Sequence, residues 1–133
     1  MNKEILIICR GGGDLATGIV HRLFRAGYQV LILETAEPAA IRRQVSFCEA
    51  VYEGTATVEG VTAERIYTAK KQAVEEVLQR GRIPLLVDPD GRSIEVLKPD
   101  VVVDAIIAKK NLGTYKEMAP LVIGVGPGFT AGE

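Results

Sequence analysis

Short runs of consecutive apolar residues alternate along the chain with segments whose apolar residues recur at helical spacing. Residues 4–9 form an apolar run that predicts a buried strand, and three glycines end it. Residues 14–26 carry apolar side chains at helical spacing and predict a helix that Gly27 ends. Residues 28–33 predict a second buried strand. The order strand, glycine turn, helix, strand is typical of a βαβ unit.

The rest of the chain continues the alternation of helices and strands. We expect a short helix at 37–43, short strands within 47–66 that include the runs 50–52 and 61–66, and an amphipathic helix at 68–80. Further strands are expected at 84–87, 101–107 and 121–125. The predicted fold is therefore α/β, a Rossmann-like three-layer sandwich with a mostly parallel sheet and a small β excursion at about 47–66.

Length and composition narrow the class of protein. The 133 residues suit a single Rossmann-like domain, 1–133, and 47% of them are hydrophobic while only 5% are aromatic. The 16 basic and 17 acidic residues nearly balance, which argues against a general nucleic-acid-binding protein. No apolar run is long enough to span a membrane and no signal-peptide pattern is present, so we expect a cytoplasmic location. Cys9 and Cys48 are interpreted as small buried hydrophobic residues.

The first glycine loop carries the strongest chemical signal. Gly11, Gly13 and Ala16 match the G-x-G-x-x-A form of the dinucleotide fingerprint: a tight turn, a close approach of pyrophosphate to the backbone, and close packing of helix on strand. The free amides at the helix start would bind the phosphate charge. Glu34 lies 21 residues after Gly13, where an acid would bind ribose hydroxyls.

The alternative interpretation of the loop is a Rossmann turn that binds nothing. Asp14 places a carboxylate at the helix start, where it could cap the free amides and repel a phosphate. Arg10 could offset that charge. The candidate binding set therefore comprises Arg10, Gly11, Gly12, Gly13, Asp14, Ala16 and Glu34.

Other polar residues are weaker candidates. Asp104 interrupts an apolar strand, and with Lys109 it forms either part of a ligand site or a structural ion pair or helix cap. Arg42 and Arg43 could meet an extra phosphate or end a solvated helix. Residues 124–130 resemble a second anion-binding turn, but the chain stops where a helix should follow. We therefore expect the chain to be the N-terminal part of a longer architecture.

The predicted first helix carries two residues with alternative explanations. His21 shares a polar helix face with Thr17 and Arg25, which predicts exposure to solvent rather than catalysis. Gly18 costs roughly 1 kcal/mol relative to alanine inside a helix, so we expect either close helix packing or the approach of a ligand or partner. No cluster resembles a metal site or a catalytic triad.

Several strings, taken together, resemble the YqeB family, accessory proteins of the selenium-dependent molybdenum hydroxylase system. The resemblance covers essentially the whole chain, and its strings are RGGGDLATG at 10–18, RRQVSF at 42–47, VDP at 87–89, KPD at 98–100, DA at 104–105, KKNLGT at 109–114 and GPGFTAGE at 126–133. The resemblance implies a Rossmann-like structure and a role in biosynthesis or insertion of the molybdenum cofactor. It supplies no established catalytic residues. It also implies that family members continue past the position of Glu133.

Three functions follow from these observations. The first is an accessory protein that binds a molybdopterin dinucleotide or NAD(P) at the first glycine loop and meets a molybdenum hydroxylase client. The second is the NAD(P)-binding domain of an oxidoreductase, and the third is a non-catalytic assembly or regulatory domain that forms homo-oligomers. The fingerprint recognises pyrophosphate and ribose, which both kinds of dinucleotide contain. The sequence leaves open whether the chain is an enzyme.

Overall fold

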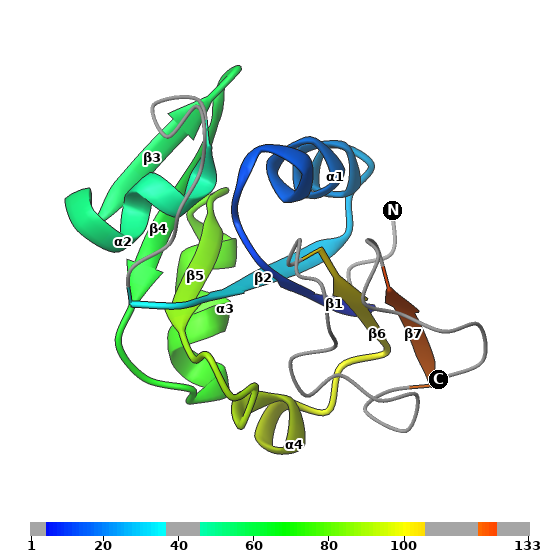
Figure 1. Ribbon diagram of the computed structural model, residues 1–133. Coiled ribbons are helices and arrows are strands. Elements are labelled where there is room, and N and C mark those ends of the chain that lie inside the picture. Colours follow the sequence, from blue (N-terminus) through cyan, green and yellow to red (C-terminus); the bar gives the residue numbers. More distant parts are fainter. Residues whose placement is uncertain (1–4, 37–45, 106–119, 125–133) are drawn as a thin grey trace.

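The computed structural model describes residues 5–36, 46–105 and 120–124, which form one seven-stranded sheet with helices on both faces (Figure 1). The strand order is β3-β4-β5-β2-β1-β6-β7, and all neighbouring strands are parallel except β3 and β4. The predicted α/β sandwich with a mostly parallel sheet is confirmed. The elements are β1 (Leu6–Arg10), α1 (Asp14–Arg25), β2 (Gln29–Glu34), the 3₁₀ helix η2 (Phe47–Glu49), α2 (Ala50–Glu53), β3 (Thr55–Val58), β4 (Val61–Ile66), α3 (Lys71–Gln79), β5 (Ile83–Val87), α4 (Ser93–Leu97), β6 (Val101–Asp104) and β7 (Leu121–Gly124).

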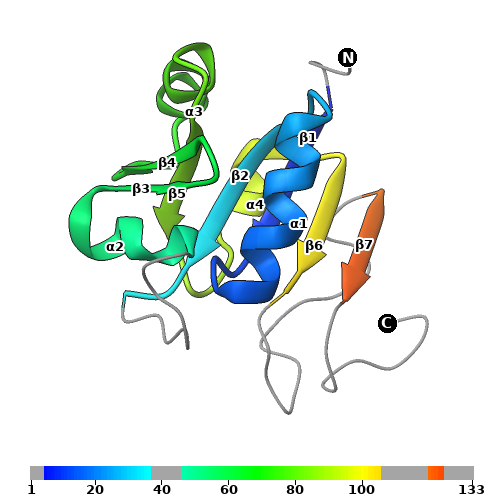
Figure 2. The same ribbon diagram turned by 90° about the horizontal axis from the view of Figure 1, so that it is seen from above.

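The two faces of the sheet bury separate apolar clusters because side chains alternate along each strand. Ile7 and Cys9 of β1 pack with Val20 of α1 on one face, together with η2 and α2. Ile8 faces the other way and packs in the cluster that contains Val74 of α3 and apolar residues of α4. Figure 2 shows α1 in front of the sheet and α4 behind it. This is the three-layer arrangement that right-handed crossovers between parallel strands produce.

Helices α1 and α3 end in the same way. Gly27 follows α1 with φ 98°, and Gly81 follows α3 with φ 74°. Both glycines adopt the left-handed conformation that a helix C-terminus commonly requires. The amide of Tyr28 then donates to the carbonyl of Leu23, and the amide of Arg82 donates to the carbonyl of Val77. The predicted role of Gly27 as the end of the first helix is confirmed, and Gly81 has the same role at the end of α3.

The expectation of strands within 47–66 is right for its second half and wrong for its first. The run 50–52 belongs to α2, where Ala50 and Val51 are buried and Tyr52 is exposed. Glu59 and Gly60 form the turn that joins the β-hairpin of β3 and β4. Both residues have positive φ, 45° and 80°, as the tight turns of hairpins require.

Other boundaries differ from the sequence prediction by a few residues. Helix α3 begins at Lys71 rather than at 68, because Lys70 is extended and its amide donates to the hydroxyl of Thr68. The predicted helix at 37–43 and the end of the predicted strand at 101–107 lie outside the described residues. Across the ranges that the structure describes, no helix combines the length and apolar character needed to cross a membrane.

Candidate functional site

The glycine loop lies at the carboxyl end of β1, where the strand order changes direction. The chain runs from β1 to β2 on one side, and β6 pairs with β1 on the other. Open α/β sheets bind ligands at this kind of switch point, outside the carboxyl ends of the strands. Two backbone hydrogen bonds extend the sheet into the loop: Gly11 donates to the carbonyl of Leu33 at 2.7 Å and Ala105 donates to that of Arg10 at 2.9 Å.

Three small residues in and next to the loop, two of them fingerprint positions, serve the fold of the loop itself. Gly11 has φ 106°, so the tight turn requires glycine. A Cβ on Gly12 would lie 3.2 Å from the backbone nitrogen of Cys48, and the amide of Cys48 donates to the carbonyl of Gly12 at 2.8 Å. Ala16 is buried against the sheet, where a larger side chain would push α1 away. Gly12 is therefore held by close packing on the segment that begins η2.

Gly13 differs from the other two glycines of the loop. Its φ is −75°, which any residue adopts, and a Cβ built on it would meet no atom within 4 Å. Neither backbone conformation nor packing within the described residues explains a glycine at this position. The space beside Gly13 is open at the start of α1, where backbone amides point outward.

The start of α1 has backbone amides but no side-chain cap. The first hydrogen bond of the helix runs from the amide of Thr17 to the carbonyl of Gly13 at 2.8 Å, and no side chain of the N-cap residue satisfies the amides of the first turn. Those amides and the helix dipole together favour an anion. The side chain of Asp14, which the sequence offered as a cap, lies outside the described part of the structure.

Glu34 reaches the loop from the end of β2. Its Oε2 accepts a hydrogen bond from the amide of Gly12 at 2.6 Å, and its Oε1 accepts one from the amide of Thr35 at 2.8 Å. The side chain is only 8% exposed. Burial raises the pKa of the Glu34 carboxyl, and the hydrogen bonds from Thr35 and Gly12 offset only part of that rise. The acid that the fingerprint spacing predicts thus lies against the loop, although bound ribose is not needed to hold it there.

Arg10 and Asp104 lie on the opposite face of the sheet from Glu34. They are neighbours in the register of β1 and β6, and each is only 1% exposed. The guanidinium of Arg10 donates to the carbonyl of Pro89 at 2.9 Å, in the turn before α4. Arg10 therefore ties the end of β1 to that turn. Lys109, the predicted companion of Asp104, lies outside the described residues.

Both cysteines are buried, as predicted. Burial, followed by the nearby carboxylates of Asp104 and Glu34, raises the pKa of the Cys9 thiol to about 12. A thiol with such a pKa is not a nucleophile at neutral pH. In the segments that the structure describes, no group of three or more His, Cys, Asp or Glu residues could hold a metal ion.

The polar face of α1 is covered more than its sequence predicts. Thr17 is buried, and its hydroxyl donates to the carbonyl of Gly12 and accepts from the amide of Phe47 at 2.9 Å. His21 is only partly exposed, since its Nε2 lies 3.2 Å from the carbonyl of Glu59 at the hairpin tip. The predicted solvent exposure therefore holds for His21 only in part. The residues that bind η2 and the hairpin to α1 come from distant parts of the chain, and local spacing gives no signal for them.

Gly18 lacks the close helix packing that was one of its two expected explanations. It is exposed, and a Cβ built on it would meet nothing within 4 Å, so helix packing does not explain the glycine. Gly124 ends β7 and is exposed. The other weaker candidates, namely Arg42, Arg43 and the rest of the second glycine loop at 125–130, lie outside the described residues.

One comparison with known proteins bears on the family. The chain is 50% identical over 128 residues, 96% of its length, to the uncharacterized protein YqeB of Escherichia coli strain K12. That match supports membership of the YqeB family. The chain spans 23% of the length of this YqeB relative. No family model and no solved structure matches the chain.

Proposed function

We propose that the glycine loop binds the pyrophosphate of a dinucleotide, and that the chain handles this nucleotide during maturation of a molybdenum hydroxylase. The observation that carries the proposal is the open space beside Gly13. A fold that needed no ligand would tolerate a side chain there, whereas a phosphate at the start of α1 needs the bare backbone. The molybdenum part of the proposal comes from the resemblance to the YqeB family.

The contacts around the loop support a phosphate with an adjoining ribose. The amides of the first turn of α1 offer donors for phosphate oxygens, since the N-cap residue Gly13 has no side chain to cap them. The carboxylate of Glu34 lies against the amide of Gly12, at the end of β2, where it can accept from ribose hydroxyls. A 2′-phosphate on the ribose would meet this buried carboxylate, so the proposed ligand has free hydroxyls.

The test is a thermal-shift panel on the 133-residue chain with NAD, NADH, NADP and the cytosine and guanine dinucleotides of molybdopterin. A ligand at 100 times its Kd adds about 2.7 kcal/mol to the free energy of unfolding. For a domain of this size that is a rise in Tm of roughly 10 °C. We expect the rise with a molybdopterin dinucleotide. A rise with NAD or NADH alone would move the assignment to an oxidoreductase domain.

The matched variants are Gly13→Val and Gly18→Val. Both add the same side chain to α1 or its cap, and in both the new Cβ meets no protein atom within 4 Å. Gly13→Val should weaken nucleotide binding by about 100-fold or more, because the side chain fills the space of the phosphate, while Gly18→Val should leave affinity unchanged. Isothermal titration of both folded variants measures this. Equal affinity in the two variants would remove the loop from the site.

A further inference from the structure

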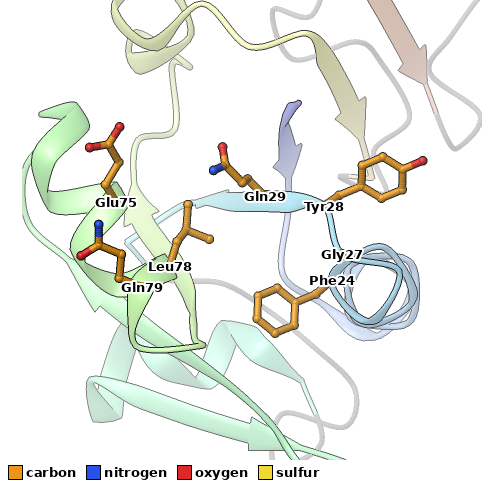
Figure 3. Close-up of a pocket in the computed structure, with 7 residues that line it drawn as sticks. All are labelled: Phe24, Gly27, Tyr28, Gln29, Glu75, Leu78 and Gln79. Atoms are coloured by element: carbon orange, nitrogen blue, oxygen red, sulfur yellow. The ribbon is translucent and has the colours of Figure 1, made fainter. Parts of the chain in front are cut away.

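A cavity lies at the other end of the sheet, at the amino end of β2. Its volume is about 680 Å³, within the range of small-molecule sites. It is lined by Phe24, Gly27, Tyr28, Gln29, Glu75, Leu78 and Gln79, which come from the last turns of α1 and α3 and from the start of β2. Figure 3 shows the side chains of Phe24 and Leu78 on opposite sides of the cavity, with Gln29 on β2 to one side of both, while the ring of Tyr28 points away.

The charges around this cavity are those that attract a cation. Both α1 and α3 end here, so the cavity lies at the negative ends of two helix dipoles. Glu75 is the only charged residue among those that line it. The ion pair that Glu75 makes with Lys71 spans 4.0 Å, with the lysine side chain 80% exposed, so it is weak.

Three of the four arginines near the two helix ends are held elsewhere. Arg25 donates to the carbonyl of Glu59 at 3.0 Å, in the hairpin tip. Arg80 and Arg82 both bind the carboxylate of Glu64, which lies on β4. These three positive charges are therefore directed toward acceptors that do not line the cavity. The fourth arginine, Arg22 in the last turn of α1, does not line the cavity either.

We propose that this cavity binds a small organic cation, an ammonium group on an apolar body. The apolar body would lie between Phe24 and Leu78, where the face of the Phe24 ring also favours a cation. The ammonium group would donate to the one side-chain oxygen of Gln29 and to the carboxylate of Glu75 at the rim. The site is separate from the glycine loop, and its assignment does not depend on nucleotide binding.

Three probes with one apolar body and different charges test the proposal: 4-phenylbutylamine, 4-phenylbutanol and 4-phenylbutyrate. Each is titrated into the ¹⁵N-labelled 133-residue chain, and the amide shifts of residues that line the cavity are followed. We expect the amine to bind tighter than the alcohol by about fivefold, and the carboxylate to bind weakest. Equal binding of amine and alcohol, or shifts that avoid the cavity, would overturn the proposal.

Two variants of α3 that each remove one negative charge test the role of Glu75, one as the test and the other as its control. Glu75→Gln should weaken binding of the amine by about fivefold and leave binding of the alcohol unchanged. Glu76→Gln removes the neighbouring carboxylate, which does not line the cavity, and should leave both affinities unchanged. Both positions are exposed, so both variants should fold. Equal effects of the two variants would show a general charge effect and contradict a built site.

Discussion

The two ends of the sheet are built from the same elements but differ in how deeply their charged side chains are buried. At the carboxyl end, Arg10, Glu34 and Asp104 are almost fully buried around the glycine loop, beside the start of α1. At the amino end, the helices finish over an open cavity, and the one charged residue that lines it, Glu75, is 51% exposed. The carboxyl end thus combines the positive end of a helix dipole with a preformed loop, while the amino end has the negative ends of two helix dipoles beside an accessible cavity. We therefore expect an anion at the carboxyl end and a cation at the amino end.

The largest expected difference between the ends is in stability. Arg10→Met removes the hydrogen bond to the carbonyl of Pro89 and takes a buried cation away from its register neighbour Asp104. We expect a loss of about 3 kcal/mol in the free energy of unfolding. Gln79→Met, at the exposed amino end, should change it by less than about 0.5 kcal/mol. Urea denaturation of both variants checks this, and similar losses would mean that the two ends are equally fixed.

A smaller effect separates two neighbouring glycines of the loop. Gly12→Ala places a Cβ 3.2 Å from the backbone nitrogen of Cys48 and 3.3 Å from a methyl group of Ile32, so we expect a loss of about 2 kcal/mol. Gly13→Ala meets no atom within 4 Å and should stay within about 0.5 kcal/mol of the original chain. Thermal unfolding without ligand measures both. If Gly13→Ala were the more damaging change, the space beside Gly13 would have a structural rather than a ligand-binding role.

The smallest predicted effect is a change in the pH dependence of stability. Because burial raises the folded-state pKa of Glu34, the folded chain retains this proton to higher pH than the unfolded chain does. The stability linked to the group is fully present below its ordinary pKa of 4.5 and is lost as pH rises through the folded value. Glu34→Gln should flatten this part of the profile, because glutamine does not titrate.

The measurement is the free energy of unfolding of Glu34→Gln and of the original chain from pH 4 to pH 8. The slope of this free energy with pH is compared between the two proteins, rather than its value at one pH. The absolute stability also changes, because glutamine has one side-chain oxygen and can accept from only one of the two amides that Glu34 binds, those of Gly12 and Thr35. Glu75→Gln at the amino end is the control, and it should leave the slope as it is in the original chain. An unchanged slope in Glu34→Gln would mean that another buried group controls this pH range.

The sequence predicts the βαβ unit well because its strands and helix are long enough for apolar spacing to be unambiguous. It fails at 50–52, where a run of three residues cannot distinguish a strand from a turn of helix. The tertiary contact that fixes this segment, a hydrogen bond from Arg65 to the carbonyl of Val51, joins residues 14 apart in the chain. Short buried segments are decided by such contacts rather than by local preference.

In the candidate site too, local spacing predicts where residues lie but does not predict their contacts with distant parts of the chain. Fingerprint spacing places Gly11 in the turn, Ala16 against the sheet and Glu34 beside the loop. It does not reveal that Gly12 packs on Cys48, which follows 36 positions later. Nor does it show that Arg10 turns toward Pro89, since alternation along a strand gives a face but not a partner.

The carbonyl of Gly12 accepts hydrogen bonds from two directions, the hydroxyl of Thr17 and the amide of Cys48, and the same hydroxyl accepts from the amide of Phe47. The loop cannot open without breaking bonds to α1 and to η2 together. It is therefore part of one cooperative unit, and the amides of Phe47 and Cys48 exchange their hydrogens with solvent only when that unit opens. Exchange at these two amides reports the local opening free energy of a loop that neither of them belongs to.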